Sequence, residues 1–155
     1  MSVVTKIPVK WQLAQGLLTS AQTQALGSDT FKGLWVVAGG GAPSLTSSGI
    51  QFVGDITSSN SEDTNIGARP TLSGVTFTIS GGVPAFSFTS IVYAQAGGDD
   101  GLSRYFIIYD SSVGANDAAH PVTCMIDPGQ TVSVVAGSLT IAAPAGGLIT
   151  FTGGG

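Results

Sequence analysis

Hydrophobic and polar residues alternate along much of the chain that follows Gly27. The clearest example is Gly74–Ser80, in which Val75, Phe77 and Ile79 fall on one side while threonine and serine fall on the other. A period of two residues is typical of a β-strand with one buried face. The pattern predicts short strands at Leu34–Val37, Ile50–Ile56, Gly74–Ser80, Phe86–Tyr93, Arg104–Tyr109, Val122–Ile126, Val132–Val135, Leu139–Ala142 and Leu148–Phe151.

Two of these segments depart from simple alternation, and each departure predicts a feature of the sheet. Arg104–Tyr109 is hydrophobic on both faces along most of its length, which is expected of a central strand. Phe86 and Phe88 have one parity, whereas Ile91 and Tyr93 have the other. A change of phase inside one strand indicates a β-bulge, so we expect a bulge there.

The predicted strands follow one another at roughly ten-residue intervals, and Gly, Pro, Asn and Asp separate them. This spacing predicts an all-β domain at residues 28–155, an antiparallel β-sandwich or jelly-roll-like barrel of about eight to nine short strands. Its core is expected to include Val75, Phe77, Ile79, Phe106, Ile108, Ile126, Ile141, Ile149 and Phe151.

Residues 1–27 have a different pattern and are expected to form an N-terminal arm and a short helix. Ser2–Val9 is β-prone but contains Pro8, which favours an edge strand or an extended arm. Between Lys10 and Leu26, small and hydrophobic residues recur at spacings of three and four, as in a helix. Trp11 at its start either anchors this helix to the β-domain or contacts another subunit.

Charged residues make up only 9% of the 155 residues, against roughly 25% in an ordinary soluble domain. A surface so poor in charge is better suited to contact with neighbouring subunits than to water. The net charge of -4 and five scattered basic residues argue against nucleic-acid binding. Gly, Pro, Ser and Thr interrupt every long charge-free stretch, so no membrane span is expected. The apolar segment Trp11–Leu18 is short and contains Gln12, Gln15 and Gly16, so no signal peptide is expected either.

The candidate residues for chemistry are few. His120 is the only histidine and Cys124 the only cysteine, so a nucleophilic site would have to use one or both. Cys124 shares its parity with Val122 and Ile126, which favours a small buried thiol over a nucleophile. We therefore expect no catalytic residue, and the chain is not predicted to be an enzyme.

Several loops could in principle bind a ligand, but turn formation explains their residues better. Asp99-Asp100-Gly101 and Asp110 with Asn116-Asp117 offer oxygen ligands for calcium without the spacing of a helix-loop-helix site. Gly39-Gly40-Gly41 lacks the residues of a phosphate-binding loop. We expect no metal and no cofactor, although calcium binding by the Asp-rich turns stays open. Ser58–Arg69, which contains Glu62-Asp63, is expected to be an exposed excursion that reaches a neighbour.

The chain resembles the small virion structural proteins of tailed phages, especially capsid decoration or cement proteins. The resemblance loosely covers Lys10–Thr152 and is one of general character: few charges, an N-terminal arm, then short strands rich in Gly, Ser and Thr. The segments that carry it are Asp29-Thr30-Phe31-Lys32, Leu72-Ser73-Gly74-Val75-Thr76-Phe77, Phe106-Ile107-Ile108-Tyr109-Asp110, Leu139-Thr140-Ile141 and Ile149-Thr150-Phe151-Thr152.

This resemblance implies a protein made in the host cytoplasm and located in the virion, on the capsid surface. Its implied partners are the major capsid protein or other virion proteins. A homo-oligomer is expected, and a trimer is the first choice because capsid lattices offer threefold sites. The alternative is a tail or collar component or a receptor-binding adhesin of the virion. A hydrolase is disfavoured because the adjacent acidic pairs lie in polar loops, a poor setting for separating two carboxyl pKa values.

Overall fold

The computed structural model describes residues 4–6, 28–37, 43, 50–59, 61–80, 83–94, 103–132, 138–141 and 149–150. The helix expected between Lys10 and Leu26 lies outside these residues, as do Gly39–Gly41 and Asp99–Gly101. The side chains of Ile79, Ile149 and Phe151, expected in the core, also lie outside the description.

The described part of the chain is mostly β-structure with one short helix. Its elements are β1 (Val4–Lys6), β2 (Phe31–Val37), α3 (Val53–Ser59), β3 (Thr76–Ser80), β4 (Val83–Ser87), β5 (Ile91–Ala94), β6 (Ser103–Asp110), β7 (Val122–Asp127), β8 (Ser138–Ile141) and β9 (Ile149–Thr150). All named strands pair antiparallel, which confirms the all-β prediction. No helix within this part is long and apolar enough to cross a membrane.

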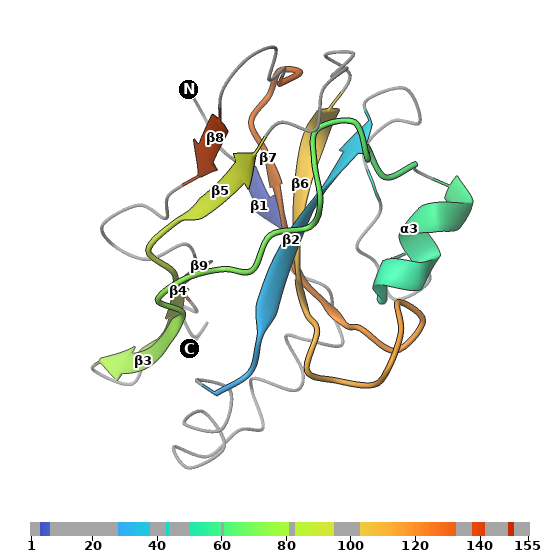
Figure 1. Cartoon of the computed structure of the whole chain (residues 1–155). Coiled ribbons are helices and arrows are strands. Elements are labelled where there is room, and N and C mark those ends of the chain that lie inside the picture. Colours follow the sequence, from blue (N-terminus) through green and yellow to red (C-terminus); the bar gives the residue numbers. More distant parts are fainter. Residues whose placement is uncertain are drawn as a thin grey trace.

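The strands form three sheets, and the four-stranded sheet is the central one (Figure 1). The largest has four strands in the order β1-β7-β6-β2, while β3-β4-β9 and β5-β8 form smaller sheets. β6 lies between β7 and β2, and both of its faces are buried. The central strand expected at Arg104–Tyr109 is therefore confirmed. β1 is an edge strand, one of the two alternatives expected near the N-terminus.

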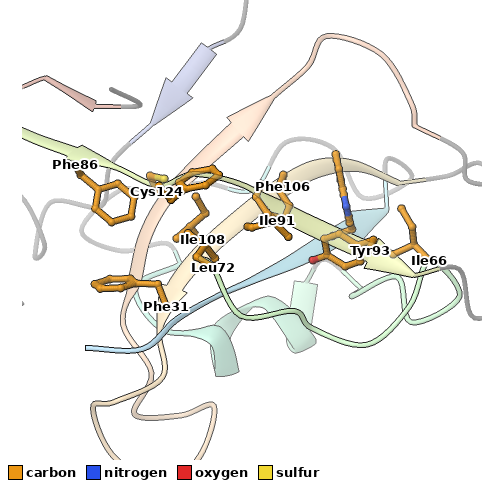
Figure 2. Close-up of a cluster of buried hydrophobic side chains, with 11 residues drawn as sticks. Phe31, Ile66, Leu72, Phe86, Ile91, Tyr93, Phe106, Ile108 and Cys124 are labelled. Carbon is orange, nitrogen blue, oxygen red and sulfur yellow. The ribbon is translucent and has the colours of Figure 1, made fainter. Parts of the chain in front are cut away.

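Two hydrophobic cores lie on opposite faces of the four-stranded sheet. One contains Phe31, Trp35, Ile66, Leu72, Phe86, Phe88, Ile91, Tyr93, Phe106, Ile108 and Cys124, and so joins this sheet to β4 and β5 (Figure 2). The other contains Leu34, Val36, Ile50, Val53, Ile56, Tyr105, Ile107, Tyr109, Val122 and Met125, and so joins the sheet to α3. In Figure 1, α3 and the smaller sheets accordingly lie to opposite sides of β2 and β6.

Phe106 is at the centre of the first core. Its ring centroid lies 5.1 Å from that of Trp35 and 6.1 Å from that of Tyr93. The same ring lies directly over Gly33 of β2, where a Cβ would overlap ring atoms. Gly33 therefore provides the space in which the Phe106 ring is packed. The expected burial of Phe106 and Ile108 is confirmed, and Val75, Phe77, Ile126 and Ile141 are partly buried against this core.

The strand expected at Ile50–Ile56 is wrong, because Val53–Ser59 is a helix. Val53 and Ile56, spaced as on one face of a helix, both pack into the second core. The carboxylate of Asp55, in the first turn, accepts hydrogen bonds from the backbone N–H groups of Gln51 and Phe52, each at 2.9 Å. This is half of a capping box, and it stabilises the start of the helix.

The bulge expected inside Phe86–Tyr93 is also wrong, because the segment is two strands in two different sheets. The strand β4 ends at Ser87 and β5 begins at Ile91. Between them the Thr89 N–H donates to the Ser73 carbonyl at 2.8 Å, which ties the crossover to the chain before β3. The change of phase thus marks the point where the chain passes from one sheet to the next.

A bulge does occur between β6 and β7. Ile108 is opposite Cys124 and Tyr109 is opposite Val122, which leaves Thr123 as the additional residue on β7. The expected common side of Val122 and Cys124 is therefore wrong: the bulge turns Val122 into the core beneath α3, while Cys124 packs into the core on the other face.

The segment Ser58–Arg69 is not the exposed excursion that was expected. Residues 58–59 end α3, and residues 61–72 return along the outer edge of β2, where Asp63, Ile66 and Leu72 are buried. Four backbone hydrogen bonds join the two: Val37 N–H to Ser61 O, Asp63 N–H to Trp35 O, Gly33 N–H to Pro70 O and Leu72 N–H to Phe31 O, between 2.8 and 3.1 Å. We call residues 61–72 the edge segment. The backbone of this segment pairs with β2 even where its side chains are polar, so polarity alone does not distinguish it from a solvated loop.

Candidate interaction site at the loop between β6 and β7

The loop between β6 and β7 is an exposed and uncharged feature of the described surface. Residues 112–116 are all exposed, and none of them carries a charge. Val113 at its tip is 47% exposed, and within the described residues only Val92 is a comparably exposed large hydrophobic residue. We call residues 112–116 the loop tip.

Hydrogen bonds fix the base of this loop. The Ser111 N–H donates to the Thr30 carbonyl at 2.9 Å, and the Thr30 N–H donates to Oγ of Ser112 at 2.6 Å. Gly114 has a φ of 77°, and a Cβ at this position would overlap the side chain of Ala119. A residue with a side chain would be strained there, so the loop tip depends on this glycine for its shape.

Arg69 of the edge segment clamps the far side of the loop. Its guanidinium donates two hydrogen bonds to the carboxylate of Glu62, at 2.7 and 2.5 Å, and two to that of Asp117, at 2.7 and 2.9 Å. Bidentate pairs of this kind are among the stronger polar contacts in proteins. Hydrogen bonding to Glu62 raises the pKa of Arg69, and hydrogen bonding to Arg69 lowers the pKa of Asp117.

Two aromatic rings complete this cluster. Tyr109 of β6 lies beneath the guanidinium, with Cζ of Arg69 5.6 Å from the ring centroid. The His120 ring stacks on Tyr109 with centroids 5.7 Å apart, and its Nδ1 lies 3.4 Å from Oδ1 of Asp117. We call Glu62, Arg69, Tyr109, Asp117 and His120 the Arg69 cluster. It joins the edge segment, β6 and the loop, which are far apart in the sequence.

The helix α3 is tied to the same loop. The Val53 N–H donates to the His120 carbonyl at 2.9 Å, and the Gly54 N–H donates to the Asp117 carbonyl at 2.8 Å. The first backbone N–H groups of a helix have no partner within it, so these carbonyls satisfy two of them. The loop therefore has anchors at both ends and against α3.

The structure separates the two residues considered for nucleophilic chemistry. His120 stacks on Tyr109, a member of the core beneath α3, whereas Cys124 belongs to the core on the opposite face of the sheet. Cys124 is fully buried, and burial raises the pKa of its thiol. The sheet lies between the imidazole and the thiol, so the two do not form a catalytic pair.

The acidic residues considered for calcium have other partners. Asp117 binds Arg69, and Oδ1 of Asp110 accepts the Ser112 N–H at 2.8 Å. Within the described residues, no group of three or more His, Cys, Asp or Glu side chains could hold a metal ion. Glu62 and Asp63 also diverge: Glu62 binds Arg69, whereas the buried Asp63 accepts a hydrogen bond from Oγ of Ser103 at 2.5 Å.

Replacing Asp110 by Asn is expected to raise the melting temperature at pH 7. Burial, together with nearby Asp29, raises the pKa of Asp110 above its ordinary value of 3.8, so the fold favours the protonated acid. Stability from this preference is present below the unfolded-state pKa and is lost as the pH rises through the folded-state pKa. Asn resembles the protonated acid at every pH and still accepts the Ser112 N–H.

Thermal unfolding at pH 7 and at about pH 2.5 measures this effect, and the gain should disappear in acid, where Asp110 is protonated. Asp127→Asn is the matched control, because Asp127 also accepts a turn N–H but pairs with Arg104. This control should show no gain at pH 7. Equal gains for both variants would mean that surface charge in general, and not burial of Asp110, is responsible.

The arrangement is suited to binding a surface. An exposed loop that is already held in one shape loses little conformational freedom on binding, and uncharged side chains are desolvated at low cost.

Comparisons with known proteins found no matching family model, no similar curated protein and no similar solved structure. The geometry and chemistry of the chain itself therefore carry the functional argument.

Proposed function

We propose that this chain is a structural protein of a tailed-phage virion and acts as a capsid decoration (cement) protein. Many copies bind the outer surface of the capsid through the major capsid protein and hold neighbouring subunits together. The observation that carries the proposal is the loop tip, which is exposed, uncharged and anchored on three sides. The role requires no catalysis, cofactor, metal, nucleic acid or membrane.

The low charge of the whole chain supports the same role. With 9% charged residues, much of the remaining surface is neutral, and the centres of protein interfaces are depleted in charge. Each neutral contact is weak. A subunit that touches several neighbours in a lattice loses its freedom of motion only once, so the contacts become strong together.

We infer that the fold is a β-sandwich, the first of the two architectures expected from the sequence. The core that contains Phe31, Phe86 and Phe106 lies between the four-stranded sheet and the smaller sheets, which supports two packed layers. An oligomer on the capsid would match the symmetry of its lattice, and a trimer at threefold sites is the arrangement we propose first.

Particles that lack this protein are expected to release their DNA at a lower temperature than complete particles, because the lattice loses cross-links. Heating with a DNA-binding dye measures the release, and adding back the purified protein should restore heat resistance. Val113→Lys should fail to restore it, because a charge at the loop tip must be desolvated on binding. Hundreds of copies per particle are expected.

Val92→Lys is the matched control for this experiment. Val92 is 51% exposed and lies on β5. Ile91 and Tyr93 of this strand pack into the core on one face of the four-stranded sheet, whereas α3 lies on the other face. This variant should restore heat resistance like the wild type. Unchanged heat resistance without the protein, together with a handful of copies per particle, would favour the tail or collar instead.

A further inference from the structure

The two edges of the four-stranded sheet are covered in different ways. The outer edge of β2 is covered by the edge segment, which contributes Ile66 and Leu72 to the core between the sheets. The edge segment cannot separate from β2 without exposing this core to water. At the other edge β7 is covered by β1, which is only three residues long.

Pairing with β1 protects the edge of β7. Its residues Cys124 and Met125 are fully buried, and β1 pairs along it with Val4 opposite Asp127, Thr5 opposite Ile126 and Lys6 opposite Met125. Without β1, the backbone N–H and C=O groups of this edge would be open to another strand. The edge of β7 is thus a binding site for a short extended segment.

The pairing of β1 with β7 is weak. Only three residues of β1 pair with β7, and a strand this short opens at a low free-energy cost. β1 and β2 lie at opposite edges of the sheet, and residues 7–30 connect them. The covalent length of this connection does not confine β1 to the β7 edge of its own chain. Extended, it could reach roughly 80 Å.

We propose that β1 is exchanged between copies of this chain: the N-terminal arm of one copy adds as the edge strand to β7 of a second copy. The register is unchanged, because the acceptor edge is identical in every copy. Each copy donates one arm and accepts one, so the exchange can close into a symmetric oligomer. This inference does not depend on the virion role.

Cysteine cross-linking between two variants tests the exchange. Thr5→Cys is made in one tagged protein and Ile126→Cys in another, and the folded proteins are mixed at about millimolar concentration and oxidised. The expected result is a covalent heterodimer whose yield rises with protein concentration, formed without denaturant. Each single variant oxidised alone, and the two mixed under reducing conditions, show how much cross-linking arises from other contacts.

The opposite edge of the sheet provides the matched control. Lys32 and Thr71 face each other across β2 and the edge segment. Lys32→Cys mixed with Thr71→Cys should give no heterodimer, because the edge segment is part of the core. The proposal is overturned if the Thr5→Cys and Ile126→Cys mixture gives none either. In that case a disulfide in the double variant would show that β1 pairs only within its own chain, and its absence that β1 does not pair with β7 at all.

Discussion

Replacing Phe106 by Ala is expected to lower the free energy of unfolding by about 3–5 kcal/mol, the usual cost of removing a buried aromatic side chain. Phe106 packs between Trp35 and Tyr93 in the core between the sheets. Its removal leaves a cavity that these neighbours cannot fill without leaving their own positions. Because small domains are stable by about 5–15 kcal/mol, the variant should be near the limit of folding. Urea unfolding followed by tryptophan fluorescence measures the change.

A double-mutant cycle with Gly33→Ala provides the control for this prediction. Alone, Gly33→Ala should destabilise the fold by about 1–3 kcal/mol, because its Cβ overlaps the Phe106 ring. In the Phe106→Ala background the same methyl group enters the cavity. The loss of unfolding free energy in the double variant should therefore be smaller than the sum of the two single losses. Strictly additive costs would show that the ring does not lie over Gly33.

Replacing Arg69 by Met should destabilise the protein by about 1–3 kcal/mol at pH 7, because it removes hydrogen bonds to two carboxylates and leaves these without their cation. Met keeps most of the apolar bulk of the side chain. The loop tip should also become more accessible to proteases, since Asp117 loses its anchor to the edge segment. Chemical unfolding and limited proteolysis measure the two effects.

The effect of Arg69→Met should depend on pH in a defined direction. Hydrogen bonding to Arg69 lowers the pKa of Asp117 below its ordinary value of 3.8. A lowered folded-state pKa contributes stability above the unfolded-state value, and this is lost as the pH falls through the folded-state pKa. The difference in unfolding free energy between the wild type and Arg69→Met should therefore become smaller below about pH 3.8.

Arg104→Met is the matched control for the Arg69 cluster. Arg104 also pairs with an aspartate, Asp127, and lies over a tyrosine, but its side chain is 35% exposed. Exposed ion pairs contribute little because water and salt screen them. This variant should unfold almost as the wild type does. Equal losses for both arginines would mean that the Arg69 cluster adds nothing beyond an ordinary surface pair.

The strands were predictable where hydrophobic periodicity was strong. The two-sided hydrophobic pattern of Arg104–Tyr109 gave the central strand β6, and the alternation in Gly74–Ser80 gave β3. The helix α3 was missed because a short apolar run fits either period. Its signal was the spacing of Ile50, Val53 and Ile56, together with an aspartate in the first turn.

The candidate site was less predictable, because its contacts join residues that are distant in the sequence. Arg69 and Asp117 are 48 positions apart, and no local pattern connects them. The edge segment looked like a solvated loop because its buried residues, Asp63 and Ile66, are separated by polar ones. Only the pairing of its backbone with β2 makes it part of the sheet.

The position of Cys124 has a consequence for the redox behaviour of the folded protein. Oxidants attack the thiolate, and this thiol is both out of contact with solvent and shifted away from the thiolate form by burial. Because Cys124 is the only cysteine, the folded chain should withstand an oxidising solution without forming disulfides between copies and without oxidation of its thiol. The thiol is expected to stay in the same redox state in reducing and in oxidising solution as long as the fold is intact.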